Sequence, residues 1–169
     1  RMSYMFHRPE LVGKPAINIV TTGGGGQKPT QEYLKLTACG WGCNLVGNLS
    51  VISPFYFKES NFFNPKYANK INKQIKYLSK EFYENIFSQK KPIPTFYDLY
   101  MFHGLKSKTY ISKADFNYWQ KKGWLNSNYY YKTKINPLKW LYSKLLDFII
   151  SSTVKRAFSR NKNMSENIS

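Results

Sequence analysis

Four consecutive glycines, Gly23 to Gly26, separate two segments of different hydrophobic pattern and constrain the fold more than any other feature. Before them, Pro15 to Thr22 is apolar and β-branched without a helical period, which predicts a strand. After them, Pro29-Thr30 opens a helix that Gly40-Trp41-Gly42 ends. A second strand, Asn44 to Ile52, follows. The order strand, helix, strand predicts a βαβ unit with parallel, adjacent strands.

The glycine run itself favours a ligand-binding loop. Backbone without side chains can adopt positive φ and approach a flat or anionic ligand, with N–H donors at the start of the following helix. A nucleotide or a flavin fits this geometry. The alternative is a flexible hairpin or linker. Neither G-x-G-x-x-G spacing nor a Walker lysine-serine pair is present, so dinucleotide-binding and P-loop folds match less well.

Helical periodicity dominates the rest of the chain. Residues 1–6 resemble the end of a helix that Pro9 stops, and the helix after the glycines places Tyr33, Leu34, Thr37 and Trp41 on one face. After an aromatic loop at 54–64, Asn64-Pro65 starts a long helix to about Gln89. Its predicted core stripe is Tyr67, Ile71, Ile75, Leu78, Phe82 and Ile86. Further helices are predicted from Thr95 to about Leu105, across Asp115–Trp124 and from Asn136-Pro137 onward, before a disordered tail at 161–169.

Composition narrows the possible partners. The 26 Lys and Arg residues against 9 Asp and Glu give a formal charge of +17, which suits nucleic acid, anionic lipid or an anionic cofactor, although drift in an AT-rich genome produces the same composition. Cys39 and Cys43 lack further ligands for a metal site, so we expect two small buried side chains in a reducing compartment. Without a signal peptide or a bilayer-length apolar run, the expected location is cytoplasmic.

Four motifs in order resemble the C-terminal half of flavodoxin-like NAD(P)H-dependent FMN reductases. They are Phe6-His7-Arg8-Pro9, Gly13-Lys14-Pro15-Ala16, Thr21-Thr22-Gly23-Gly24-Gly25 and Trp41-Gly42-Cys43-Asn44-Leu45-Val46-Gly47. The later segments Tyr118–Trp124 and Tyr129-Tyr130-Tyr131 are similar to a C-terminal extension in one clostridial-type branch of that family.

The resemblance implies an α/β fold: part of a doubly wound parallel sheet, strands four and five with their crossover helix, followed by an α-helical extension. It implies that Thr21, Thr22, Gly23, Gly24, Gly25 and Gly26 lie beside the isoalloxazine ring of FMN. NAD(P)H would be the co-substrate, and a small molecule or a protein would accept the electrons. The flavin carries the chemistry, so no catalytic side chain is expected. His7 is a further candidate contact with the cofactor, or else a helix-capping residue.

On this interpretation, residues 1–90 are the C-terminal half of a flavodoxin-like domain, 91–160 a lysine- and aromatic-rich helical extension, and 161–169 its tail. The family's phosphate-binding first loop has no counterpart in the sequence, and Arg1 stands where an initiator Met would, so we expect a piece of a longer protein. A homo-oligomer is also expected.

The lysine- and aromatic-rich C-terminal half leaves a second class of function open. Its tyrosines and tryptophans between 118 and 131 could stack bases, although no OB-like run of strands accompanies them, so nucleic acid is not favoured. The helix at 137–158 could lie on an anionic membrane, or pack on the flavodoxin-like body or a second subunit. For His103, packing in an aromatic helix is the favoured interpretation.

Overall fold

The computed structural model describes residues 4–52, 65–88 and 91–166, and side-chain environments as far as residue 153. It is a mixed α/β protein, with a two-strand parallel sheet and its helices followed by a helical C-terminal region. The chain divides into two compact units: a sheet unit, Glu10–Lys91, and a helical unit that joins Arg1–Pro9 to Pro92–Ser169. The first nine residues, which the sequence groups with the sheet, thus belong to the helical unit.

The two strands of the sheet unit are parallel neighbours, as predicted. Strand β1 (Pro15–Thr22) pairs with β2 (Asn44–Ile52), and both have the bounds expected from the sequence. Asn18 is buried in β1 and donates from Nδ2 to Oδ1 of Asn48, its register partner, at 3.0 Å. Because the amide finds a partner across the sheet, this polar residue can lie inside the core.

Helix α2 (Gln27–Gly40) connects the strands and begins two residues before the predicted start at Pro29. Pro29 lies in the first turn, where its missing N–H has no partner within the helix in any case. The helix buries Ala38 near its end, whereas Tyr33, predicted on the packing face, is 67% exposed. The prediction is therefore wrong for Tyr33, whereas Leu34, Thr37 and Trp41 are partly covered as predicted and Ala38 adds to the same face.

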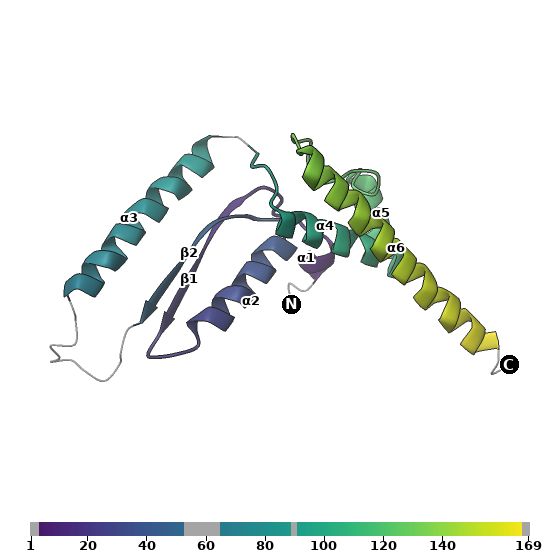
Figure 1. The fold of residues 1–169 in the computed structure, drawn as a ribbon, viewed down its shortest axis with the longest axis horizontal. Coiled ribbons are helices and arrows are strands. Elements are labelled where there is room, and N and C mark those ends of the chain that lie inside the picture. Colours follow the sequence, from purple (N-terminus) through teal and green to yellow (C-terminus); the bar gives the residue numbers. More distant parts are fainter. Residues whose placement is uncertain (1–3, 53–64, 89–90, 167–169) are drawn as a thin grey trace. The chain divides into compact units, whose positions relative to one another are not determined.

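Helix α3 (Pro65–Phe87) packs on both strands, and Figure 1 shows it on the opposite side of them from α2. Its predicted core stripe is covered only in part: Ile71 is buried, but Ile75 and Ile86 are 41% and 48% exposed. Neighbouring strands lie only about 4.8 Å apart, whereas a helix with its side chains is about 10 Å wide. A sheet of two strands therefore covers only part of the stripe and leaves the rest in water. The predicted aromatic loop at 54–64 lies outside the described residues.

The helical unit begins with α1 (Tyr4–His7), the short helix predicted before Pro9. Its next helix, α4 (Phe96–Lys108), starts at the predicted cap: the backbone N–H of Thr95 donates to Asp98 Oδ2 at 2.8 Å, and Asp98 N–H donates back to Thr95 Oγ1 at 3.2 Å. This reciprocal capping box fixes where the chain enters α4.

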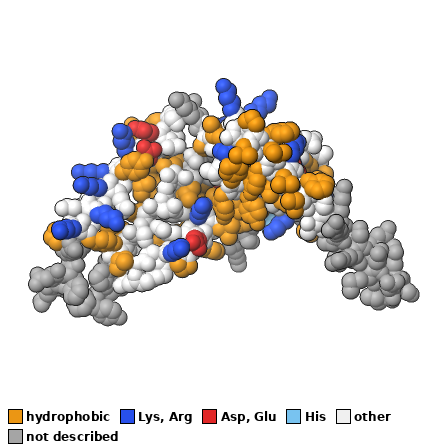
Figure 2. All heavy atoms as spheres, in the orientation of Figure 1, with side chains coloured by type: hydrophobic (Ala, Val, Ile, Leu, Met, Phe, Trp, Pro, Cys, Tyr) orange, Lys and Arg blue, Asp and Glu red, His pale blue; other side chains and the backbone are white. Residues whose placement is uncertain are grey.

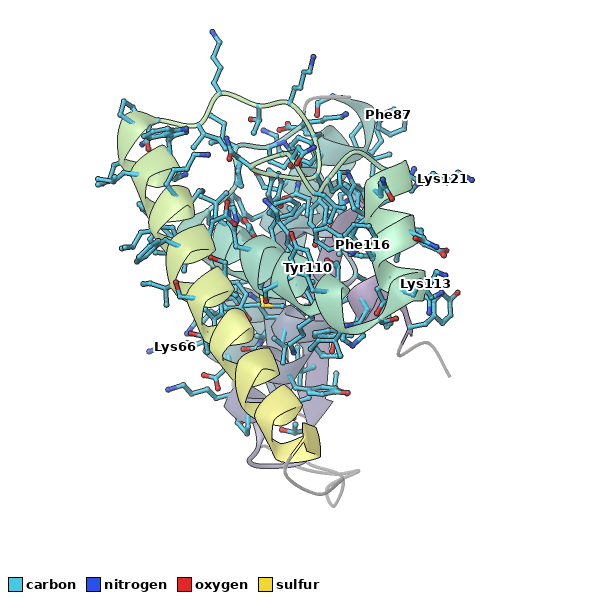
Figure 3. The ribbon with its side chains drawn as sticks, turned by 90° about the vertical axis from the view of Figure 1, so that its right-hand side faces the viewer. Lys66, Phe87, Tyr110, Lys113, Phe116 and Lys121 are labelled. Atoms are coloured by element: carbon cyan, nitrogen blue, oxygen red, sulfur yellow. The ribbon has the colours of Figure 1, made fainter. Side chains whose placement is uncertain are left out.

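A 3₁₀ turn, η1 (Thr109–Ile111), leads into α5 (Lys113–Lys121). Ser112 rather than Asp115 caps α5, and Gly123 closes it with a φ of +72°. Asp115 instead forms an ion pair with Arg8, whose Nε lies 2.9 Å from Asp115 Oδ1. Figure 3 shows Tyr110 and Phe116 side by side between η1 and α5, with Lys113 and Lys121 on the outer side of α5.

The last helix, α6 (Pro137–Glu166), starts as predicted, with Asn136 Oδ1 accepting from Lys139 N–H at 2.8 Å. It continues through Glu166, six residues into the predicted disordered tail. The sequence holds no glycine or proline after Pro137 that would stop it. Among the described helices, α6 included, we find none with the length and apolarity to cross a bilayer.

Aromatic rings fill the core of the helical unit. Trp119 and Phe102 are fully buried and lie 5.3 Å apart between ring centroids. The Trp119 indole N–H donates to the carbonyl oxygen of His7 at 2.6 Å, which fastens the N-terminal segment to α5. The cluster is completed by Trp124, Tyr129 and Tyr130.

Candidate functional site

The predicted site residues in the sheet unit lie at the carboxyl edge of the sheet. Thr21 and Thr22 end β1, and their register partners Val51 and Ile52 end β2. The backbone N–H of Ile52 donates to the hydroxyl oxygen of Tyr67 at 2.9 Å, so the start of α3 also reaches this edge. In parallel α/β sheets, ligands bind where strands end in this way.

Side chains hold the carbonyl oxygens of the glycine loop, Gly23–Gly26. Gln27 Nε2 donates to the carbonyl of Gly24 at 2.7 Å, and Thr30 Oγ1 donates to the carbonyl of Gly26 at 2.8 Å. Thr22 Oγ1 lies 3.5 Å from the Gly24 carbonyl, a weak contact that leaves the hydroxyl available to another acceptor. The side chains of the residues that flank the glycines therefore fix the shape of the loop.

Gly26 is the N-cap of α2 and has a φ of +84°. It brings no side chain to cap the helix, so the first backbone N–H groups of α2 keep their capacity to donate. The helix dipole adds partial positive charge at the same end. The loop therefore offers backbone donors to an electron-rich or anionic group.

Packing within the protein does not explain the glycines at 24 and 25. All four loop residues are exposed, and a Cβ atom placed on Gly24 or Gly25 would meet no other atom within 4 Å. Gly47 in β2 is different, since its Cβ would collide with Leu78 of α3. A Cβ at 47 thus requires the end of the Leu78 side chain to shift, whereas at 24 and 25 internal packing places no restriction on the residue.

Sequence reasoning missed Gln27 and Tyr67 as members of this edge. Gln27 follows the glycines directly, so its position in the sequence is enough to predict that it lies beside the loop. Tyr67 was assigned to a core stripe by its spacing, and only the fold shows that its hydroxyl meets the end of β2.

His7, the remaining predicted cofactor contact, belongs to the helical unit. It is the last residue of α1, and its carbonyl oxygen accepts from the Trp119 indole. This backbone role fits the helix-terminal alternative that the sequence also allowed.

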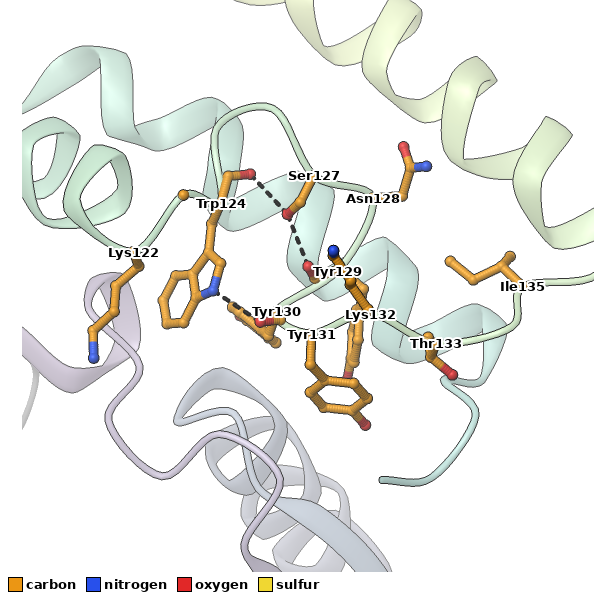
Figure 4. A pocket seen from close by; sticks show the side chains of 11 residues that line it. Lys122, Trp124, Ser127, Asn128, Tyr129, Tyr130, Tyr131, Lys132, Thr133 and Ile135 are labelled. Atoms are coloured by element: carbon orange, nitrogen blue, oxygen red, sulfur yellow. Dashed lines mark hydrogen bonds between the residues drawn. The ribbon is translucent and has the colours of Figure 1, made fainter. Parts of the chain in front are cut away.

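A pocket, here called the aromatic pocket, lies in the helical unit (Figure 4) and has a volume of about 440 Å³. Hydrogen bonds within the loop hold its shape: the Trp124 indole N–H donates to the Tyr130 carbonyl at 2.9 Å, and Ser127 Oγ contacts the carbonyls of Trp124 and Tyr129. The pocket is lined by Lys122, Gly123, Trp124, Ser127, Asn128, Tyr129, Tyr130, Tyr131, Lys132, Thr133 and Ile135.

The aromatic pocket is built from core rings more than from exposed ones. Trp124, Tyr129 and Tyr130 are less than 10% exposed, so little of their faces is open to a stacking base. Burial and the charge of Asp98 raise the pKa of Tyr131 to about 12, and its hydroxyl donates to the Pro92 carbonyl at 2.9 Å. These tyrosines act as structural side chains, which weakens the base-stacking interpretation.

A polar cluster joins α4 to α6. Asp147 Oδ1 lies 2.6 Å from Nδ1 of His103, and Lys106 Nζ lies 3.6 Å from Asp147 Oδ2. Burial alone would raise the pKa of Asp147, but the hydrogen bond and charge of His103 together with the Lys106 ammonium hold it below its ordinary value. His103 is 1% exposed, which confirms the prediction that it packs in the core.

Cys39 and Cys43 are not joined in a disulfide, and burial raises the pKa of the Cys43 thiol, which favours its protonated form. Over the residues with described side chains, no three His, Cys, Asp or Glu groups come together as a metal site. Comparison with protein-family models, curated proteins and solved structures found no match to this chain.

Proposed function

We propose that this chain is part of a cytoplasmic FMN-dependent NAD(P)H oxidoreductase of flavodoxin-like fold, in which the glycine loop lies against the isoalloxazine ring. One observation carries the proposal: glycines at 24 and 25, which internal packing does not require, occupy an exposed loop at the carboxyl edge of a parallel sheet. A flat ring resting on the backbone would explain them, because any side chain there would hold the ring away.

The architecture of the sheet unit supports the same proposal. Two adjacent parallel strands with a crossover helix on one side and a second helix on the other match strands four and five of a doubly wound sheet. Ile19 of β1 is 62% exposed, although it is a β-branched residue in a strand. A wider sheet, with a further strand beside β1 and broader cover on that face, would bury it.

In this proposal the protein binds and orients the cofactor. Backbone N–H groups of Gly24–Gly26 would donate to the oxygens and N5 of the ring, and the Thr22 hydroxyl would add one hydrogen bond. The bound flavin supplies hydride acceptance from NAD(P)H and electron transfer to a small molecule or a protein. Tyr67, at the end of β2, would border the same edge.

The proposal is tested by titrating the ¹⁵N-labelled full chain with lumiflavin and with FMN. Because the loop recognises the ring, we expect both to bind with similar, modest affinity and to shift the amide resonances of Thr21–Gln27. Shifts confined to the aromatic pocket, or no response to either flavin at about 1 mM, would contradict the proposal.

Gly24→Val and Gly25→Val provide the matched variants. Neither position has a positive φ or a neighbour that a Cβ would meet, so urea stability should stay within about 0.5 kcal/mol. Flavin affinity should nevertheless fall at least about tenfold. Gly123→Val, at the end of α5, is the control for valine at an exposed glycine; it should lower stability because φ is +72° but leave flavin binding unchanged.

A further inference from the structure

Helix α6 has one face packed on α4 and an opposite face whose apolar side chains are exposed. Toward α4, Ser143 is fully buried, Tyr142 packs edge-on against Phe96 at 5.2 Å, and Asp147 contacts His103. The other face carries what we call the α6 stripe. Its side chains are Leu138, Leu141, Leu145, Phe148 and Ile149, which are 64%, 60%, 53%, 71% and 50% exposed.

The stripe is continuous along the helix. Its members follow one another at spacings of three, four, three and one residues, which covers an arc of roughly 100° at 3.6 residues per turn. Figure 2 shows hydrophobic side chains gathered over the first half of α6, with Lys and Arg side chains near the border. A soluble surface rarely leaves five large side chains together in water, so the stripe marks an interaction surface.

Charge decides between the partners that such a stripe could take. On α6, Lys144 borders the stripe and lies 5.8 Å from the Trp140 ring centroid, whereas Lys139 lies toward α4 and donates to the Pro94 carbonyl. The one described acid of the helix, Asp147, is engaged by His103 and Lys106 on the opposite face. Beyond residue 153 the sequence of α6 adds Lys155, Arg156, Arg160 and Lys162 against Glu166 alone.

We infer that the α6 stripe binds an anionic lipid surface, with α6 lying in the plane of the headgroups. Five apolar side chains would enter the acyl boundary, while Lys144 would reach the phosphates and Trp140 would sit at the interface. A second copy of the chain is the weaker partner because it also carries a formal charge of +17 and would repel the first. This inference does not depend on the proposed flavin chemistry.

The experiment is vesicle co-sedimentation of the full chain. Vesicles of phosphatidylcholine with about a third phosphatidylglycerol should bind it, and vesicles of phosphatidylcholine alone should bind it at least about tenfold more weakly, with the difference shrinking as salt is raised. Binding that is equal on both, or absent from the anionic vesicles at low salt, overturns the inference.

The matched pair Phe148→Glu and Phe87→Glu separates the stripe from general exposure. Both phenylalanines are exposed on helices, at 71% and 65%, but Phe87 lies on α3 in the sheet unit. Phe148→Glu should weaken binding at least about tenfold, and Phe87→Glu much less. An equal loss for both, or none for either, would mean that charge alone drives binding. Far-UV circular dichroism checks that each variant folds.

Two further measurements distinguish the competing occupants. Lys144→Gln should weaken binding to the anionic vesicles about fivefold. Lipids brominated on the acyl chain should quench tryptophan fluorescence of the bound chain, and this quenching should be lost in Trp140→Phe. If instead the chain sediments as a dimer that Phe148→Glu dissociates, while vesicles bind neither form, the stripe is a self-association surface and the lipid inference fails.

Discussion

The two units of this protein differ in the size of their buried cores, although both expose large apolar side chains. In the helical unit, Trp119 and Phe102 are fully buried within a continuous aromatic cluster. In the sheet unit, the buried set is small, and Ile19, Tyr77 and Phe87 are more than 60% exposed. The helical unit therefore has a core of its own, whereas the two-strand sheet unit buries fewer large side chains.

The difference also separates stability from the candidate site. The glycine loop belongs to the unit with the smaller core, and the aromatic cluster belongs to the other. Regions that bind ligands are commonly drawn from the less stable part of a protein, and added cover or a bound ligand would stabilise the sheet unit. Substitutions in the two units can show whether they also differ in their free energy of unfolding.

The largest effect is expected from Trp119→Ala. The substitution opens a cavity next to Phe102 and removes the indole donor to the His7 carbonyl, so the free energy of unfolding of the helical unit should fall by about 3–5 kcal/mol. Urea denaturation followed by circular dichroism measures it. Trp140→Ala, at a residue 48% exposed, is the control and should cost less than about 1 kcal/mol. Equal losses for the two would remove the distinction between core and surface tryptophans.

Gly47→Ala and Gly104→Ala should change stability in opposite directions, one in each unit. A Cβ at position 47 meets the end of the Leu78 side chain, which has to shift, so alanine should cost up to about 1 kcal/mol. Gly104 lies inside α4, where a Cβ meets nothing within 4 Å, and alanine should stabilise the protein by about 0.5–1 kcal/mol through its helix propensity. Thermal unfolding measures both. A destabilised Gly104→Ala would show that α4 is packed more closely than the structure indicates.

The capping box of α4 gives a smaller effect. Thr95→Ala removes the hydroxyl that accepts from Asp98 N–H and donates to Asp98 Oδ2, and should cost about 1 kcal/mol. Thr95→Ser keeps the hydroxyl and should retain most of the stability. If both variants lose the same amount in urea denaturation, the β-methyl of Thr95 matters more than the cap.

Much of this architecture follows from local sequence, and the exceptions have physical causes. The bounds of β1 and β2, the caps at Thr95 and Asn136, and the parallel pairing are confirmed because strand propensity and capping act over a few residues. Burial depends on what lies opposite, so spacing alone misassigned Tyr33, Ile75 and Ile86. The functional assignment of Thr21–Gly26 stays a prediction, although the fold places the loop at a strand end where a ligand could lie.

The smallest effect concerns the ion pair between α4 and α6 and its dependence on pH. The pKa of Asp147 is held below its ordinary value of 3.8 in the folded protein, so the unfolded chain takes up a proton at higher pH than the folded one does. The stabilisation is therefore fully present above about pH 4 and is lost as pH falls further.

Asp147→Asn should flatten that part of the curve of stability against pH. The effect should be slight, because the carboxylate is 34% exposed and screened by water. Glu84→Gln, which removes a surface pair with Lys80 at 3.9 Å, is the control and should leave the curve unchanged. Urea midpoints between pH 3 and 6 measure the difference. An Asp147→Asn curve as steep as that of the parent protein would mean that α6 is held on α4 by its apolar contacts alone.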